Sequence, residues 1–175
     1  LVGFRDGRAP YAAFAQDARY LWDDAEPGRW WDLGLRTFEC TKPLLALPLY
    51  VTLATLGLDT VEAIVDHAFA LARRLAALVD SDDELELVAA PDTNIVCFRY
   101  RFAEGIDADA AHEAIRARLR SAGEVFVVSA RVDSRIVLRV SLMSPTCTGQ
   151  DLEYALEAVR RVGREIAHQN GAAGT

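Results

Sequence analysis

The stretch that organises this chain reads Gly34-Leu35-Arg36-Thr37-Phe38-Glu39-Cys40-Thr41-Lys42-Pro43-Leu44-Leu45-Ala46-Leu47-Pro48-Leu49-Tyr50. Its first seven residues (34–40) predict a short, mostly buried strand. A polar turn follows at Thr41, and an apolar helix begins with a proline in its first turn, where a backbone N–H is not needed. A strand that turns at a hydroxyl residue into a helix leaves free N–H groups, which suit a phosphate or carboxylate. Most junctions of this kind, however, bind nothing.

Composition narrows the class of protein. The chain has 175 residues, of which 51% are hydrophobic and 26% charged, so it can form a core and has the size of one domain, or of a small domain plus part of another. The net charge of −7 argues against a nucleic-acid surface. A membrane span is not expected either, because Asp59 and Glu62 close the longest apolar run before it reaches about 18 residues.

Cysteine and histidine usage excludes two further kinds of site. Cys40, Cys97 and Cys147 are odd in number and far apart, and no C-x-x-C pair exists. We therefore expect neither a disulfide framework nor a structural zinc site, and the reducing cytoplasm is the expected location. His67 has no second histidine or cysteine at ligand spacing, so we expect a surface residue and no metal centre.

The periodicity of residues 58–170 predicts one compact unit. Its segments read helix, strand, strand, helix, strand, strand, helix, with approximate limits 59–79, 85–89, 95–100, 107–122, 125–130, 135–143 and 148–170. Adjacent hairpins favour an antiparallel sheet with helices on one face, an α+β arrangement. We expect a capping box at Asp59 and Glu62, a hairpin turn at residues 132–134 and a helix cap at Thr148.

Residues 1–57 do not predict a domain of their own. They contain two strand fragments, at residues 1–4 and 34–40, and one helix that Pro48 should kink. This is too little apolar surface to close a core. The chain also starts at Leu1 without an initiator Met, so we expect it to be part of a larger protein. The predicted division is therefore 1–57, the end of a larger domain, and 58–175, a small α+β domain.

Five pieces, in order, resemble the C-terminal third of the group II pyridoxal-phosphate-dependent amino acid decarboxylases. They are Phe4-Arg5-Asp6, Tyr20-Leu21-Trp22, Cys40-Thr41-Lys42 with its helix, Asn94-Ile95-Val96-Cys97-Phe98-Arg99, and Leu138-Arg139-Val140 followed by Ser144-Pro145 and Asp151-Leu152. The resemblance covers nearly the whole chain. It implies the C-terminal part of an α/β enzyme of the aspartate-aminotransferase fold (fold type I). It also implies a cytoplasmic homodimer that releases carbon dioxide from an L-amino acid.

The resemblance gives four residues a role. Tyr20 would donate a proton to the substrate Cα when its loop closes, and Arg139 would bind the substrate carboxylate. Thr41, with Cys40 before it, would lie near the cofactor phosphate of the neighbouring subunit. Thr41 replaces the family's usual glycine, and its Cβ crowds that approach. Two of these roles have a structural alternative: Tyr20 as a packed or exposed loop aromatic, and Arg139 as an outward-facing strand residue.

The resemblance also implies a residue that this sequence lacks. The only lysine is Lys42, which stands in the wrong context for a Schiff base, so pyridoxal phosphate would be held by residues not in this chain. We therefore expect the chain to be inactive alone. Two alternatives stay open: an aminotransferase or other lyase of the same fold, and a non-catalytic α+β binding module. The sequence does not identify which amino acid is the substrate.

Overall fold

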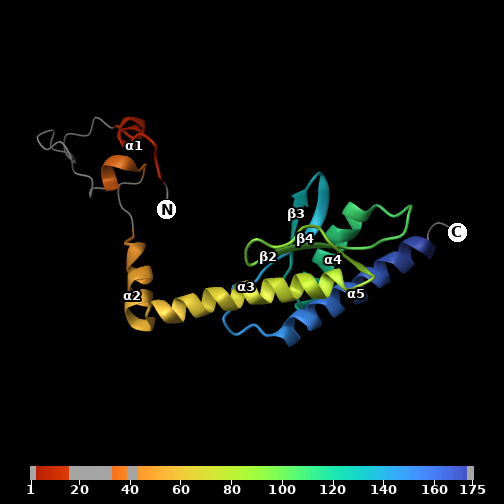
Figure 1. Ribbon diagram of the computed structural model, residues 1–175. Coiled ribbons are helices and arrows are strands. Elements are labelled where there is room, and N and C mark those ends of the chain that lie inside the picture. Colours follow the sequence, from red (N-terminus) through yellow and green to blue (C-terminus); the bar gives the residue numbers. More distant parts are fainter. Residues whose placement is uncertain (1–2, 16–32, 39–42, 173–175) are drawn as a thin grey trace, which may run out of the picture. The chain divides into compact units, whose positions relative to one another are not determined.

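The computed structural model describes residues 3–15, 33–38 and 43–172, shown in Figure 1. The chain forms two compact units, Leu1–Thr55 and Leu56–Thr175. The division falls two residues before the predicted one. The assignment of the first unit to the end of a larger domain stays a prediction.

The described part of the first unit is helical. It contains α1 (Ala9–Ala13), the 3-10 helix η1 (Leu33–Arg36) and most of α2 (Ala46–Leu56). The predicted strand over 34–40 is wrong where it is described, because η1 occupies its first residues and Phe38 is 88% exposed. Phe4 is likewise outside any strand. A strand needs a neighbour to pair its backbone, and the described residues of this unit offer none.

Helix α2 begins three residues later than its proline pattern predicts. It starts at Ala46, so Pro48 occupies the first turn, where its missing N–H removes no intrahelical hydrogen bond. None of its residues is buried, although the helix is strongly apolar. Among the helices of the described residues, no single one is both long enough and apolar enough to cross a membrane.

The second unit contains the predicted antiparallel sheet. Its strands are β1 (Leu85–Leu87), β2 (Ile95–Tyr100), β3 (Val128–Val132) and β4 (Arg135–Ser141), in the spatial order β1-β2-β4-β3. The β3–β4 hairpin turns at Asp133 and Ser134, which have φ values of 46° and 67°. Two successive positive φ values are typical of a tight two-residue hairpin turn, and they confirm the predicted turn position.

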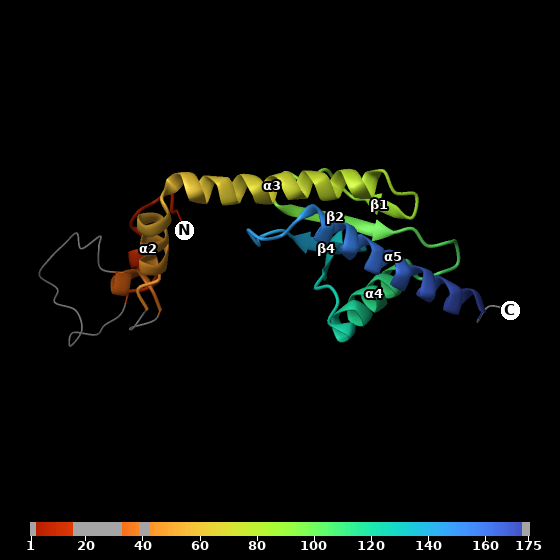
Figure 2. The ribbon, with the colours of Figure 1, turned by 90° about the horizontal axis from the view of Figure 1, so that it is seen from below.

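Three helices cover one face of this sheet: α3 (Leu58–Asp80), α4 (Ala108–Ala122) and α5 (Gly149–Ala172). Figures 1 and 2 show α3 and α5 running along the sheet. The buried core combines alternate strand residues with the inner faces of all three helices, including Val96, Phe98, Tyr100, Leu138, Leu75, Ile115, Leu119, Leu156 and Val159. This confirms the predicted α+β layer arrangement.

The helix ends show where local capping signals held and where they failed. Asp59 and Glu62 do not form the predicted capping box, because α3 begins at Leu58 with Gly57 as its N-cap and no side-chain cap. Asp59 is therefore the second residue of the helix, two positions past the N-cap, and cannot cap it. Thr148 does cap α5 as predicted: its Oγ1 accepts the Asp151 N–H at 3.4 Å, and Asp151 Oδ2 accepts the Thr148 N–H at 2.7 Å.

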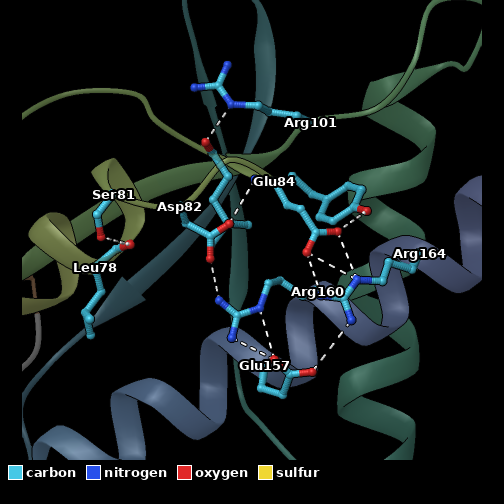
Figure 3. Close-up of polar contacts among 10 residues, drawn as sticks. Leu78, Ser81, Asp82, Glu84, Arg101, Glu157, Arg160 and Arg164 are labelled. Atoms are coloured by element: carbon cyan, nitrogen blue, oxygen red, sulfur yellow. Dashed lines mark hydrogen bonds and ion pairs between the residues drawn. The ribbon is translucent and has the colours of Figure 1, made fainter.

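A charged network fastens α5 to the loop between α3 and β1 (Figure 3). Arg164 reaches Glu84 at 2.6 Å, and Arg160 pairs with both Asp82 and Glu157. Glu84 also accepts a hydrogen bond from the hydroxyl of Tyr100, the last residue of β2, at 3.0 Å. The network therefore fixes the end of β2 relative to the helices.

Candidate functional site

The candidate site lies on the face of the sheet opposite the helices, here called the second face. Side chains alternate between the two faces along a strand, so Cys97, Val137 and Arg139 face away from Val96, Phe98 and Leu138. None of the first three belongs to the buried cluster that the helices share. The register places Cys97 of β2, Arg139 of β4 and Val128 of β3 in one row across three strands.

Arg139 stands out in this row because its charge is unpaired. It is half-buried, and it has neither an ion pair nor a hydrogen bond from its side chain to any other residue in the described part of the chain. A guanidinium carries several N–H donors in a fixed plane. Its side chain is therefore free to bind an external acceptor, and a carboxylate matches that plane with two parallel hydrogen bonds.

The other arginines of the sheet have partners. Arg99 donates to Asp109 at 3.1 Å and also to the carbonyl of Ile136. Arg135 pairs with Glu86 at 2.9 Å. Arg131 and Arg101 each donate to a backbone carbonyl, at 2.7 Å in both cases. Arg139 therefore differs from its neighbours in charge pairing as well as in position.

Cys97 is the polar neighbour of Arg139 within the row. Burial raises the pKa of its thiol, and the positive charge of Arg139 opposes that rise. The raised pKa keeps the thiol protonated near neutral pH. On the other side of Arg139, Val128 offers no polar side-chain atom. The site within the described residues is thus one cation between a small thiol and a small hydrocarbon.

A partly buried polar cluster that the sequence does not reveal contacts the far ends of the same two strands. Asp109 of α4 accepts the backbone N–H of Ile136 at 2.9 Å, and His112 Nε2 accepts the backbone N–H of Tyr100 at 3.0 Å. These hydrogen bonds satisfy backbone N–H groups beyond the last β2–β4 pair, where the strands no longer pair with each other. Burial lowers the pKa of His112, so the ring is neutral and can accept. The one sequence signal is a histidine on the apolar face of α4.

The structure places only one of the four predicted site residues. Tyr20, Cys40 and Thr41 lie outside the described residues, so their predicted convergence with Arg139 stays a prediction. Arg139 lies half-buried on the second face, and its predicted carboxylate-binding role stays a prediction. His67, predicted to be a surface residue, is exposed, and its Nε2–H donates to the carbonyl of Cys147 at 2.9 Å.

The described residues do not fit covalent attachment of pyridoxal phosphate. A Schiff base needs a lysine amine, and residues 3–15, 33–38 and 43–172 contain no lysine. They offer instead the guanidinium of Arg139, which suits an anionic group of a substrate. No catalytic step through the cofactor can therefore be assigned to the described side chains.

No known family model matches the chain. Among curated proteins, it is 29% identical over 161 residues to the L-2,4-diaminobutyrate decarboxylase of Rhizobium meliloti (strain 1021), which covers 91% of this chain and 32% of that protein. The chain thus spans about a third of that relative's length.

Two solved structures match in fold and sequence. The glutamate decarboxylase domain of a diaminobutyrate–pyruvate transaminase and L-2,4-diaminobutyrate decarboxylase from Vibrio parahaemolyticus has a TM-score of 0.68 and 25% identity, over 76% of this chain and 28% of that one. Oryza sativa TDC, solved with PLP and tryptamine, has a TM-score of 0.63 and 28% identity, over 69% of this chain and 27% of that one.

The fold is that of an α/β C-terminal domain of a fold type I decarboxylase. The curated proteins and solved structures that the chain is similar to are group II pyridoxal-phosphate-dependent amino acid decarboxylases, and the matches align to the C-terminal portion of those longer proteins.

Proposed function

We propose that this chain is the C-terminal part of a pyridoxal-phosphate-dependent carboxy-lyase that releases carbon dioxide from an L-amino acid. The observation that carries the proposal is the guanidinium of Arg139, which has no ion pair and no side-chain hydrogen bond among the described residues. The relatives of the chain that contains it are amino acid decarboxylases. Other arginines of the sheet have acceptors within the chain, whereas Arg139 is left to bind a substrate carboxylate.

In this proposal the cofactor supplies the electron sink for the bond that breaks, and it is held by a lysine other than Lys42. The chain's own residues orient and protonate the substrate. Arg139 binds a carboxylate, and Tyr20 delivers a proton to the substrate Cα after carbon dioxide leaves. Thr41, preceded by Cys40, contacts the cofactor phosphate of the second subunit, which requires a homodimer.

The test uses the complete protein and a panel of L-amino acids. Carbon dioxide and amine should form in equal amounts from one class of amino acid. Borohydride should fix the cofactor onto a lysine other than Lys42, as peptide mass spectrometry can show. Formation of a keto acid without carbon dioxide would indicate an aminotransferase instead. A complete protein that binds no pyridoxal phosphate would leave the non-catalytic module as the answer.

Tyr20 separates a decarboxylase from other reactions of the same fold. Its removal in Tyr20→Phe should slow amine release more than carbon dioxide release, because the proton donor to Cα is lost. Product analysis under air should then show aldehyde and ammonia in place of part of the amine, with dioxygen accepting the two electrons and forming hydrogen peroxide. An unchanged ratio of amine to carbon dioxide would exclude Tyr20 as the donor.

A further inference from the structure

Cys97 is the direct neighbour of Arg139 on the second face of the sheet. Cys97 and Arg139 are direct Cα partners on antiparallel strands. Such partners have Cβ atoms about 4.5–5.5 Å apart, so the thiol lies against the stem of the arginine. Val128 occupies the equivalent place on the other side, on β3. The side chain of Arg139 therefore projects from the sheet between the side chains of Cys97 and Val128.

The rows on either side are uncharged where they approach Arg139. Toward one end lie Ile95 and Ser141, and toward the other Val137 and Ala130. The next charges on this face are Arg99 of β2 and its cross-strand partner Glu86 of β1, and both are already paired: Arg99, which is 6% exposed, with Asp109, and Glu86 with Arg135. No carboxylate of the described residues is therefore placed to occupy the guanidinium.

We propose that Cys97 is a positioning residue for substrate binding: its small, uncharged side chain keeps the guanidinium of Arg139 accessible and directed at the incoming carboxylate. This inference rests on the proposed function. An acidic side chain at residue 97 would form an internal pair with Arg139 and compete with the substrate. A thiol packs against the stem of Arg139 and is too small to block the guanidinium.

The test compares three variants of the complete protein. Cys97→Asp places a carboxylate in direct register with Arg139, and Val132→Asp places one on the same face opposite Arg135 instead. We expect Cys97→Asp to raise KM roughly 10- to 100-fold, the range of a charge-assisted hydrogen bond, with kcat changed less than about threefold. Cys97→Ser should restore KM to near the wild-type value, and Val132→Asp should leave it there.

Arg139→Met separates failure of this inference from failure of the proposed site. If Arg139→Met raises KM and Cys97→Asp does not, the role of Cys97 is wrong and the carboxylate site stands. If neither variant changes KM, the site itself is wrong. Carbon dioxide release by the wild-type protein, measured in the same assay, reports separately on the proposed reaction.

A chemical probe covers the case in which Cys97→Asp fails to fold. Methyl methanethiosulfonate transfers its thiomethyl group to a thiolate and releases methanesulfinate, so labelling at Cys97 can be followed by mass spectrometry. Saturating substrate should slow labelling of Cys97 about tenfold or more, should leave Cys147 unaffected, and should lose this effect in Arg139→Met. Equal labelling of Cys97 with and without substrate would overturn the proposal.

Discussion

The two faces of the four-stranded sheet use the same strands for opposite purposes. On the helix-covered face, Phe98 and Leu138 are cross-strand partners and are buried almost completely. On the second face, one residue along each strand, the partners are Cys97 and Arg139, both only half-buried. The first face is satisfied within the chain. On the second face, Arg139 has no charged partner among the described residues, so we expect stability and binding to be divided between the faces.

Charge pairing makes the same distinction. Around the helices, Arg160 and Arg164 each contact two carboxylates, and the network joins α5 to the loop between α3 and β1. Such pairs hold elements together and leave nothing for a ligand. Arg139 has no such partner among the described residues. Because no carboxylate of the described residues pairs with Arg139, its guanidinium is available to a substrate.

The largest effect on stability should come from the helix-covered face. Phe98→Ala removes a ring that is 1% exposed, and truncation of a buried Phe lowers the free energy of unfolding by about 3–5 kcal/mol. Val128→Ala, on the second face, should lower it by only about 1 kcal/mol, because less apolar area leaves water there. Urea unfolding of the two variants would measure the difference, and equal losses would contradict the division between faces.

A smaller loss should follow from Gly163→Ala in α5. A Cβ at this position would lie 2.6 Å from the ring of Tyr100, which is 7% exposed and cannot move freely. Overpacking of this kind lowers the free energy of unfolding by about 1–3 kcal/mol. Gly7→Ala, where a Cβ meets nothing within 4 Å, is the matched control. Thermal unfolding that shifts equally in both variants would show that close packing on Tyr100 is not the reason.

Acidification should weaken the cluster that closes β2 and β4. Burial lowers the pKa of His112 below its ordinary value of 6.5, and Arg99, Asp109 and Glu86 surround it. The unfolded chain therefore takes up this proton first. The contribution of the neutral His112 ring to the free energy of unfolding is therefore complete above about pH 6.5, and it decreases as the pH drops below that value.

His112→Gln should remove this part of the pH dependence. The stability that Asp109 and Glu84 contribute as carboxylates is lost only at lower pH, because hydrogen bonds hold the pKa of both carboxyls below the usual range. Urea unfolding at a series of pH values separates the two windows. Identical slopes between pH 5 and 6.5 in wild type and His112→Gln would contradict the role given to His112.

The smallest effect should come from the exposed network of Figure 3. Arg164→Gln removes its pair with Glu84, and both side chains are partly open to solvent. Salt screens such pairs. We expect the loss to be smaller than in Gly163→Ala and to shrink further in 1 M salt. A loss that does not depend on salt would indicate that packing, and not charge, holds α5 to the loop between α3 and β1.

Sequence patterns predicted the second unit well because its signals repeat. Helix α3 keeps an apolar face through Leu71, Leu75 and Val79, and the strands keep a period of two. Predictions that depended on one or two residues had mixed outcomes: the Thr148 cap and the turn at residues 132–134 are confirmed, whereas two others are wrong. The capping box at Asp59 is wrong because the N-cap of α3 is Gly57, two residues earlier, and the strand over 34–40 is wrong where it is described because the described residues of that unit provide no partner strand.

The site could be predicted only in part. A family resemblance singled out Arg139, but no pattern could show that its charge is unpaired. That property depends on the partners of the neighbouring arginines, and these come from distant segments: Asp109 from α4 and Glu86 from β1. The neighbour Cys97 follows from strand register, which a sequence without a defined loop between β2 and β4 does not specify.

The most direct test of the account is the preference of the complete protein for an amino acid over the matching amine, which differs from it only by the carboxylate. Arg139→Met should weaken binding of the amino acid roughly 10- to 100-fold, with binding of the amine within about twofold of wild type and the cofactor absorbance unchanged. If Arg139→Met leaves the preference for the amino acid intact, or weakens both ligands equally, Arg139 does not bind the carboxylate.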